Sequence, residues 1–145
     1  MFELNYDEMI ILDAENLAEC GIAEAYQSLL PKLREHVASP AGIDEIADND
    51  EPRYAVRSGA GQFLIYAPGI SEGQSWANAT YALFAIVNNQ LTDCAYRFYA
   101  INGGNDLGGM FLRPADADAA RESLPRKSDW PYVPTGKPPW YGQHH

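Results

Sequence analysis

Carboxylates are the chemically active side chains that the sequence concentrates most strongly. Residues 44–51, with the sequence DEIADNDE, carry five acids and no base. Such a density could bind a divalent cation, but the Asp-x-Asn/Asp-x-Asn/Asp-Gly spacing of a calcium loop is absent. We therefore expect no dedicated metal site and no cofactor, and we interpret these carboxylates as surface charge.

Residues with a capacity for catalysis are sparse. Of the three histidines, His144 and His145 end the chain, and His36 lies near the end of the first predicted helix. The HExxH, GxSxG and Cys/His metal-binding patterns are all missing. The glycine-rich stretch at 102–109 has no phosphate-loop lysine and leads into a predicted strand, so we interpret it as a hairpin turn. The sequence therefore favours a non-catalytic protein over an enzyme.

The acidic charge is confined to the first third of the chain. Residues 1–52 hold 13 acids against Lys32 and Arg34, a net charge of −11, whereas residues 53–145 hold 7 acids against 8 bases, a net charge of +1. Charge of this kind repels nucleic acid and anionic membranes and attracts basic protein surfaces. Acidity that serves solubility alone remains the alternative. The predicted partner-binding residues are Asp13, Glu15, Glu19, Glu24, Asp44, Glu45, Asp48, Asp50 and Glu51.

The elements that carry these acids are predicted as a short strand, a helix and a loop. Met9 to Leu12 forms an apolar run suited to a strand. Asp13 or Asn16 is the expected N-cap of a helix that reaches about residue 37, although Gly21 weakens it and Pro31 should kink or divide it. Residues 38–52 are predicted as an acidic, turn-rich loop. The apolar positions of the helix form one stripe, at Ile22, Tyr26, Leu29, Leu33 and Val37.

The rest of the chain is predicted as two hairpins that alternate with helices. Strands are expected at 54–57 and 62–66, and again at 94–101 and 107–112. Ser75 should cap a largely buried helix at 76–90, and Pro114 should begin a short helix at 114–124. The predicted fold is a single α+β domain, residues 1–145, in which an antiparallel sheet built from hairpins packs with two main helices and one short helix. Its parts are an acidic helical third (1–52), a core (53–124) and a tail (125–145).

The C-terminal tail is rich in prolines and aromatic rings, including Trp130, Tyr132, Trp140 and Tyr141. We interpret it as an extended strip that packs on the domain, and Gly108 and Gly109 indicate a bulge or a close backbone approach where it could lie. Two alternatives stay open. The tail could be a recognition element of an adaptor or structural protein, or a pocket could bind a small molecule, as in an enzyme. Such a pocket would be lined by Trp76, Tyr81, Tyr96 and Tyr99, for which ordinary core packing is the favoured interpretation.

In size, acidity and α+β pattern the chain resembles the small immunity proteins that bacteria make against polymorphic or contact-delivered toxins. The resemblance implies that the acidic surface docks on a basic toxin domain, often a nuclease, and covers its active site. An acidic N-terminus and the absence of a long apolar run lead us to expect a cytoplasmic protein that binds neither membrane nor nucleic acid. Cys20 and Cys94 are expected to be reduced, buried thiols, and the oligomeric state stays open.

Overall fold

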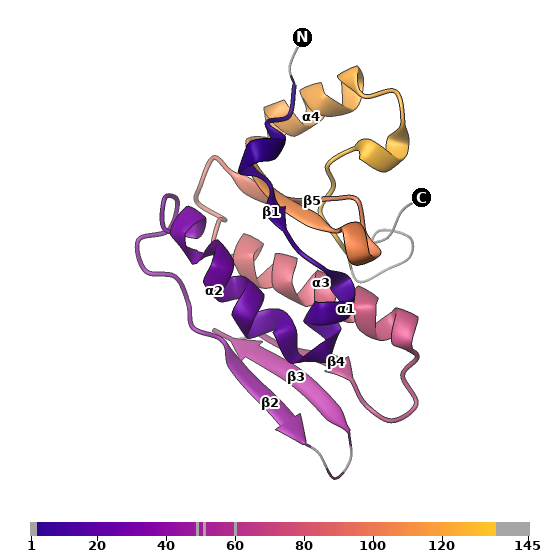
Figure 1. Cartoon of the computed structure of the whole chain (residues 1–145). Helices are drawn as coiled ribbons and strands as arrows, with labels where there is room; N and C mark the ends of the chain where they lie inside the picture. Colours follow the sequence, from indigo (N-terminus) through magenta and orange to yellow (C-terminus); the bar gives the residue numbers. More distant parts are fainter. Residues whose placement is uncertain (1–2, 49, 51, 60, 136–145) are drawn as a thin grey trace.

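Helix α3 (Glu72–Asn89) is the element around which the others pack. The computed structural model describes residues 3–48, 50, 52–59 and 61–135. Most of the α3 side chains from Ala77 to Val87 are buried, and α3 contacts strands of both sheets, β4 (Gly61–Tyr66) and β5 (Arg97–Ile101). Figure 1 shows α3 and α2 (Ile22–Leu33) between the two sheets. The near-continuous apolar sequence of α3 therefore reflects burial on several sides.

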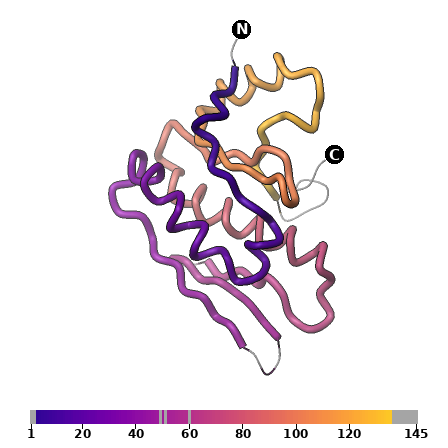
Figure 2. The backbone as a smooth tube through the Cα atoms, in the orientation of Figure 1, coloured from indigo at the N-terminus to yellow at the C-terminus, as the bar shows by residue number. Residues whose placement is uncertain are grey.

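Both sheets have three strands and are antiparallel. One has the order β1 (Ile10–Ile11), β6 (Gly108–Leu112), β5, and the other has the order β2 (Asp44–Asp48), β3 (Arg53–Ser58), β4. The hairpins β3–β4 and β5–β6 are those that the sequence predicts, and α4 (Pro114–Ser123) begins at its proline as expected. Figure 2 shows the first strand lying beside the last hairpin. The α+β prediction is confirmed, with the strands divided between two sheets.

The first predicted helix is interrupted, and the prediction of one helix to residue 37 is wrong. Asp13 caps α1 (Ala14–Asn16), and its Oδ1 accepts hydrogen bonds from the amides of Glu15 (2.9 Å) and Asn16 (3.4 Å). A π turn (Leu17–Gly21) follows, in which Cys20 adopts a φ of 69°. A Cβ on Gly21 would collide with the backbone carbonyl of Asn16, so a glycine is required there. The kink therefore falls at the π turn, and Pro31 lies within the last turns of α2 without dividing it.

Three other predicted boundaries are also wrong. Residues 44–48 form strand β2 instead of a loop, because pairing with β3 outweighs the weak strand propensity of aspartate and glutamate. Ser71, not Ser75, caps α3, accepting a hydrogen bond from the Gln74 amide at 3.2 Å. Strand β5 begins at Arg97, because residues 91–96 form turns whose carbonyls accept hydrogen bonds from the Arg97 guanidinium.

The tail approaches the free edge of β5, and β6 with its two glycines lies on the other side of β5. Tyr132 pairs with Ala100 of β5 through two backbone hydrogen bonds (2.6 and 3.0 Å), which places a fourth extended segment beside β5. Gly108 and Gly109 lie on β6 in an unbroken register, closely approached by the Met9 side chain and the Phe98 ring respectively. The bulge or tail contact expected at these glycines is therefore replaced by contacts from the residue that precedes β1 and from β5.

Candidate functional site

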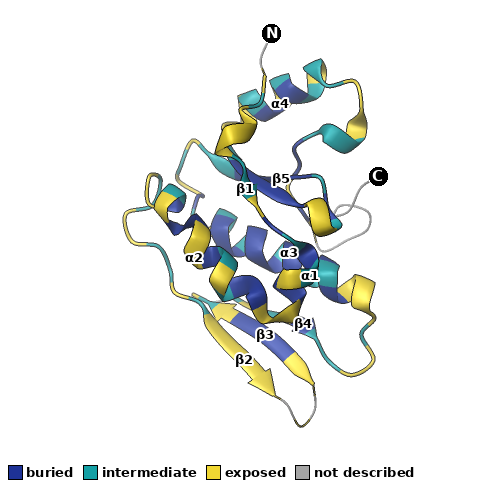
Figure 3. Ribbon diagram, viewed as in Figure 1, coloured by how far each residue is buried: buried dark blue, intermediate teal, exposed yellow. Residues whose placement is uncertain are grey.

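The nine predicted partner-binding acids lie in two parts of the structure. Asp13 and Glu15 lie beside the turn before β6, where the Asn105 amide donates to both carboxylates (3.0 and 3.4 Å). The other described acids are exposed, and Figure 3 shows that strand β2 is exposed along its whole length. Glu51 lies outside the described residues. The exposed members are Glu19, Glu24, Asp44, Glu45, Asp48 and Asp50.

Strand β2 presents different chemistry on its two faces. The register places Glu45 beside Val56, on the face toward α2, and its carboxylate accepts a hydrogen bond from the Tyr54 hydroxyl at 2.6 Å. The same hydroxyl accepts one from the Ile22 amide at 3.3 Å, which links β2 and β3 to the first turn of α2. The outer face instead carries Asp44, which pairs with Arg57 at 3.5 Å. The charge that stays unbalanced therefore lies toward α2 and the kink.

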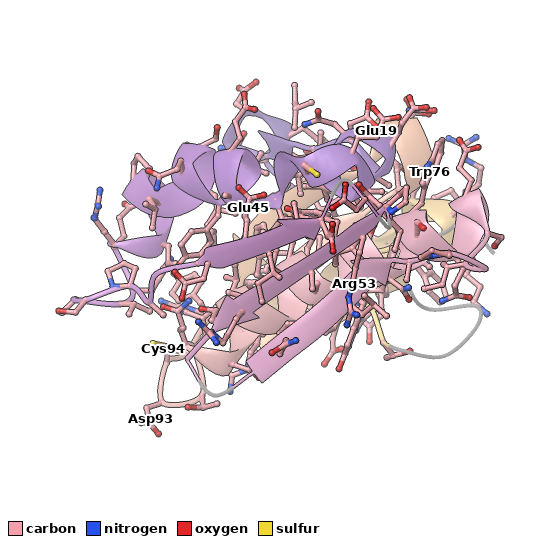
Figure 4. All side chains as sticks on the ribbon, turned by 90° about the horizontal axis from the view of Figure 1, so that it is seen from below. Glu19, Glu45, Arg53, Trp76, Asp93 and Cys94 are labelled. Carbon is pink, nitrogen blue, oxygen red and sulfur yellow. The ribbon has the colours of Figure 1, made fainter. Side chains whose placement is uncertain are left out.

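A surface hollow of about 410 Å³ lies at the kink, between the π turn, the end of β4 and the first turn of α3. We call it the kink hollow. Figure 4 shows Glu19 beside Trp76 at this end of the molecule, with Asp93 at the opposite end. The lining residues are Ala18, Glu19, Cys20, Tyr66, Glu72, Ser75 and Trp76.

The kink hollow is acidic and partly aromatic. Glu19 and Glu72 contribute carboxylates from two different elements, and no lysine, arginine or histidine is among the lining residues. The Cys20 thiol lies 3.9 Å from the Tyr66 hydroxyl, and burial together with this contact raises the pKa of Tyr66 above its ordinary value. A catalytic thiol is usually activated by a neighbouring histidine or cation, and the lining residues include neither. The chemistry that the hollow favours is the binding of a cation.

The acids at the end of β2 belong to the same region. The sheet register aligns Ala47 with Tyr54 and Tyr54 with Tyr66, so the end of β2 lies two strands, roughly 10 Å, from a wall of the hollow. Asp48 and Asp50 continue from that point, and Arg53 lies opposite Asp48 in the register. We call this region, with its six described acids and Arg53, the acidic end. Its acids are Glu19, Glu24, Glu45, Asp48, Asp50 and Glu72.

Several residues of the kink hollow were not predicted from the sequence. Cys20 is exposed, which corrects the expectation of a buried thiol, whereas Cys94 is half-buried and donates to the His36 carbonyl at 3.2 Å. The sequence places Tyr66 in the predicted strand at 62–66, Glu72 in the loop that follows it, and Ser75 at the predicted start of the next helix. No local pattern marks them, because only the break at the π turn brings them beside Glu19.

The four rings proposed to line one pocket lie in different surroundings. Trp76 lines the kink hollow, and Tyr81 packs its edge against Phe63, with ring centroids 6.0 Å apart. Tyr96 lies on the His36 ring at 4.5 Å, and the Tyr99 ring lies 5.9 Å from the Arg121 guanidinium. The described contacts therefore do not bring these rings together around a shared ligand.

The described part of the tail packs against the domain. The Trp130 indole donates to the Leu124 carbonyl at 3.0 Å, and the Tyr132 hydroxyl donates to the Asn102 carbonyl at 2.6 Å. The Arg121 guanidinium donates to the Pro131 carbonyl at 3.0 Å. Trp140 and Tyr141 lie outside the described residues.

Comparison with known proteins gives no relative to guide the interpretation. No protein-family model, curated protein or solved structure matches this chain. Within the described residues, no cluster of three or more histidine, cysteine or acidic side chains is arranged to hold a metal ion. None of the described helices is both long and apolar enough to cross a membrane.

Proposed function

We propose that this chain is a non-catalytic protein-binding domain whose acidic end docks on a basic protein. The proposed class is that of an immunity protein, which neutralises a toxin domain by covering it. The observation that carries the proposal is the kink hollow itself, which is lined by glutamates from the π turn and α3 and by no basic side chain. Unbalanced charge in a concave surface attracts an oppositely charged partner and speeds its association.

The edge position of β2 supports a partner of opposite charge over a second copy of the chain. Strand β2 pairs with β3 on one side only, and its other edge belongs to no described strand. Pairing β2 with the β2 of another copy would bring Asp44, Glu45 and Asp48 of the two strands together. Charged edge strands are a common protection against such pairing. A basic protein surface meets no such repulsion.

An apolar row on the outer face of the same sheet could extend the contact. The register aligns Ile46 with Ala55 and Ala55 with Leu64, and the side chains of Ile46 and Leu64 remain 39% and 41% exposed. Stable interfaces combine a desolvated apolar centre with a charged rim. The row therefore offers apolar area beside the acidic end.

The experiment that tests the proposal is affinity capture from the native cell with charge-reversed variants. The test variant combines Glu24→Lys, Asp48→Lys and Asp50→Lys, three exposed acids outside the kink hollow. The matched control combines Asp93→Lys, Asp106→Lys and Glu122→Lys, three exposed acids elsewhere. We expect the wild type and the control to capture the same basic protein, and the test variant to lose it.

Co-expression tests the immunity role directly. The captured partner should impair growth when it is expressed alone, and this chain should restore growth. Equal capture of the partner by the test and control variants, or a captured partner that is not basic, would contradict the proposed acidic interface. Capture of a basic partner that is not toxic would support the protein-binding function and reject the immunity role.

A further inference from the structure

We propose that the kink hollow is an anchor pocket for one guanidinium side chain of the basic partner. This inference rests on the proposed function and specifies which chemistry the acidic end recognises. The hollow of about 410 Å³ falls at the small end of the range of ligand sites, so it suits one side chain better than a folded segment.

Ser75 supplies an observation that does not depend on the acidic charge. The residue is 6% exposed and lines the kink hollow, while its amide donates to the Ser71 carbonyl at 2.9 Å. The Ser75 hydroxyl makes no hydrogen bond to any residue that the structure describes. Among those residues no fully enclosed side-chain polar atom lacks a partner, so this hydroxyl is accessible, and Ser75 lines the hollow. A hydroxyl at a pocket wall that bonds no protein group can accept a hydrogen bond from a ligand N–H group.

The other lining groups suit a planar cation. Glu19 and Glu72 provide carboxylate acceptors, and a guanidinium group presents several N–H donors in a fixed plane that matches carboxylate geometry. The Trp76 indole, partly buried against the core, lines the same hollow and supplies an aromatic ring for a cation–π contact with such a plane. An ammonium group has three donors around a point charge and gains less from the ring and from two separated carboxylates. The combination therefore favours arginine over lysine.

The backbone that forms one wall is held before any ligand arrives. The Asp13 cap fixes the first turn of α1, and the packing of Gly21 against Asn16 fixes the other end of the π turn. Ala18 between them is 4% exposed and belongs to the main core. A site that is already ordered costs less entropy on binding.

Cys20 allows the pocket to be tested without the natural partner. Its thiol is exposed and lines the hollow, so it can exchange with a small disulfide and hold the released half inside the pocket at high effective concentration. The full chain with Cys94→Ser is equilibrated with equal amounts of bis(2-guanidinoethyl) disulfide and bis(2-hydroxyethyl) disulfide. Each exchange forms one protein–probe disulfide and releases one small thiol. Intact mass spectrometry then gives the ratio of the two adducts.

We expect the guanidinium adduct to exceed the hydroxyl adduct by about tenfold, which corresponds to about 1.4 kcal/mol. Glu19→Gln with Glu72→Gln should reduce the ratio to below about threefold, and Ser75→Ala should lower it by about a factor of two to three. The control is Asp93→Asn with Glu122→Gln, which removes the same charge far from the pocket and should leave the ratio within about twofold of the wild type. These ranges follow from the usual strength of charge-assisted and cation–π contacts.

Two results would overturn the inference. One is a ratio near unity in the wild-type pocket. The other is an equal loss in the pocket variant and the remote control, which would mean that net charge alone attracts the probe. The capture experiment changes no residue of the kink hollow, so the two tests can fail separately. An adduct ratio near unity together with charge-dependent capture rejects the guanidinium pocket and keeps the protein-binding function. A tenfold ratio without a basic partner rejects the protein-binding function and, with it, the partner assigned to the pocket, but keeps the pocket's preference for a guanidinium group.

Discussion

At the scale of single residues, Gly109 shows how closely the centre of the β5–β6 sheet is packed. A Cβ at this position would collide with the ring of Phe98, which is fully buried and packs on Phe84 (4.5 Å between centroids) and Phe111 (4.7 Å). The Phe98 ring therefore has no free direction in which to move. Gly109→Ala should lower the free energy of unfolding by about 1–3 kcal/mol, the usual cost of overpacking a core.

Gly73 is the matched control for this substitution. It lies in the first turn of α3, and a Cβ there meets no atom within 4 Å. Gly73→Ala should raise the free energy of unfolding by about 0.5–1 kcal/mol, because alanine favours the helix and reduces the entropy of the unfolded chain. Urea denaturation of both variants measures the two effects. Equal effects of the two substitutions would contradict the close packing at Gly109.

Tyr54 should make the free energy of unfolding decrease at alkaline pH. Burial, together with its hydrogen bond to Glu45, raises the pKa of Tyr54 well above the ordinary value for tyrosine. In the unfolded chain the hydroxyl ionises near pH 10, so above that pH the folded state binds more protons than the unfolded state. Tyr54 should therefore leave the free energy of unfolding unchanged below pH 10 and contribute a decrease of about 1.4 kcal/mol per pH unit above it. Burial raises the pKa of Tyr132 in the same direction.

Tyr54→Phe separates this effect from ordinary alkaline denaturation. The variant should be less stable at pH 7 by about 1–3 kcal/mol, because the Ile22 amide and the Glu45 carboxylate both lose a partner. Its loss of stability above pH 10 should be shallower than in the wild type. Tyr81→Phe, at a half-exposed ring, is the control, and urea titrations from pH 7 to 11 give the comparison. Parallel decline in the wild type and Tyr54→Phe would rule out the assigned role.

At the scale of elements, the sequence predicts those parts of the fold whose signals are local. Asp13 was one of two expected caps, and aromatic strands around turn residues predict both hairpins. Strand β2 carries no such signal, because its pairing with β3 is decided by contacts across the sheet. The positive φ of Cys20 likewise carries no local sequence signal, and it falls beside Gly21, which packs on Asn16. The kink hollow depends on that turn. Of its lining residues, the sequence therefore indicates only Glu19, as a partner-binding acid, and Trp76, as a possible pocket ring, as candidate functional residues.

The tail segment from Trp130 to Thr135 pairs with the free edge of β5 at Tyr132. Tyr132 is 7% exposed and is held by backbone hydrogen bonds to Ala100 and by its hydroxyl to Asn102. Burial of a tyrosine of this size and its hydrogen bonds stabilises the fold by a few kcal/mol. Truncation after Lys127 should therefore lower Tm by roughly 5–10 °C.

Truncation after Thr135 provides the comparison for this prediction. It keeps the hydrogen bonds of Trp130 to Leu124 and of Tyr132 to Ala100 and Asn102, and removes only residues 136–145. Differential scanning calorimetry of both truncated proteins isolates the contribution of residues 128–135 as the difference in Tm. A difference of less than about 2 °C would show that this segment does not stabilise the domain. Unchanged stability with lost partner binding would instead make the tail a recognition element.

At the scale of the whole molecule, one acidic surface is packed on a nearly neutral body. The first 52 residues carry 13 acids against Lys32 and Arg34, yet β1, α1 and α2 contribute side chains to a core shared with the rest of the chain. The described ion pairs are Glu8–Lys32, Asp44–Arg57, Asp118–Arg121 and Asp129–Arg126, and each has a partner with more than half of its side chain exposed. Exposed pairs contribute little to stability. Repulsion among the carboxylates is therefore the larger electrostatic effect on the folded state.

The net charge of −10 should make this protein more stable in salt. Raising NaCl from 0.01 M to 1 M shortens the Debye length from about 30 Å to about 3 Å, which screens the repulsion within the acidic end. We expect Tm to rise by about 3–6 °C, equivalent to roughly 1–2 kcal/mol for a chain of this size. A variant that combines Glu24→Gln, Asp48→Asn and Asp50→Asn should begin with a higher Tm at low salt and gain less on addition of NaCl. If Tm fell with salt instead, favourable ion pairs would dominate, and the acidic end would not hold the unbalanced charge on which the proposed interface depends.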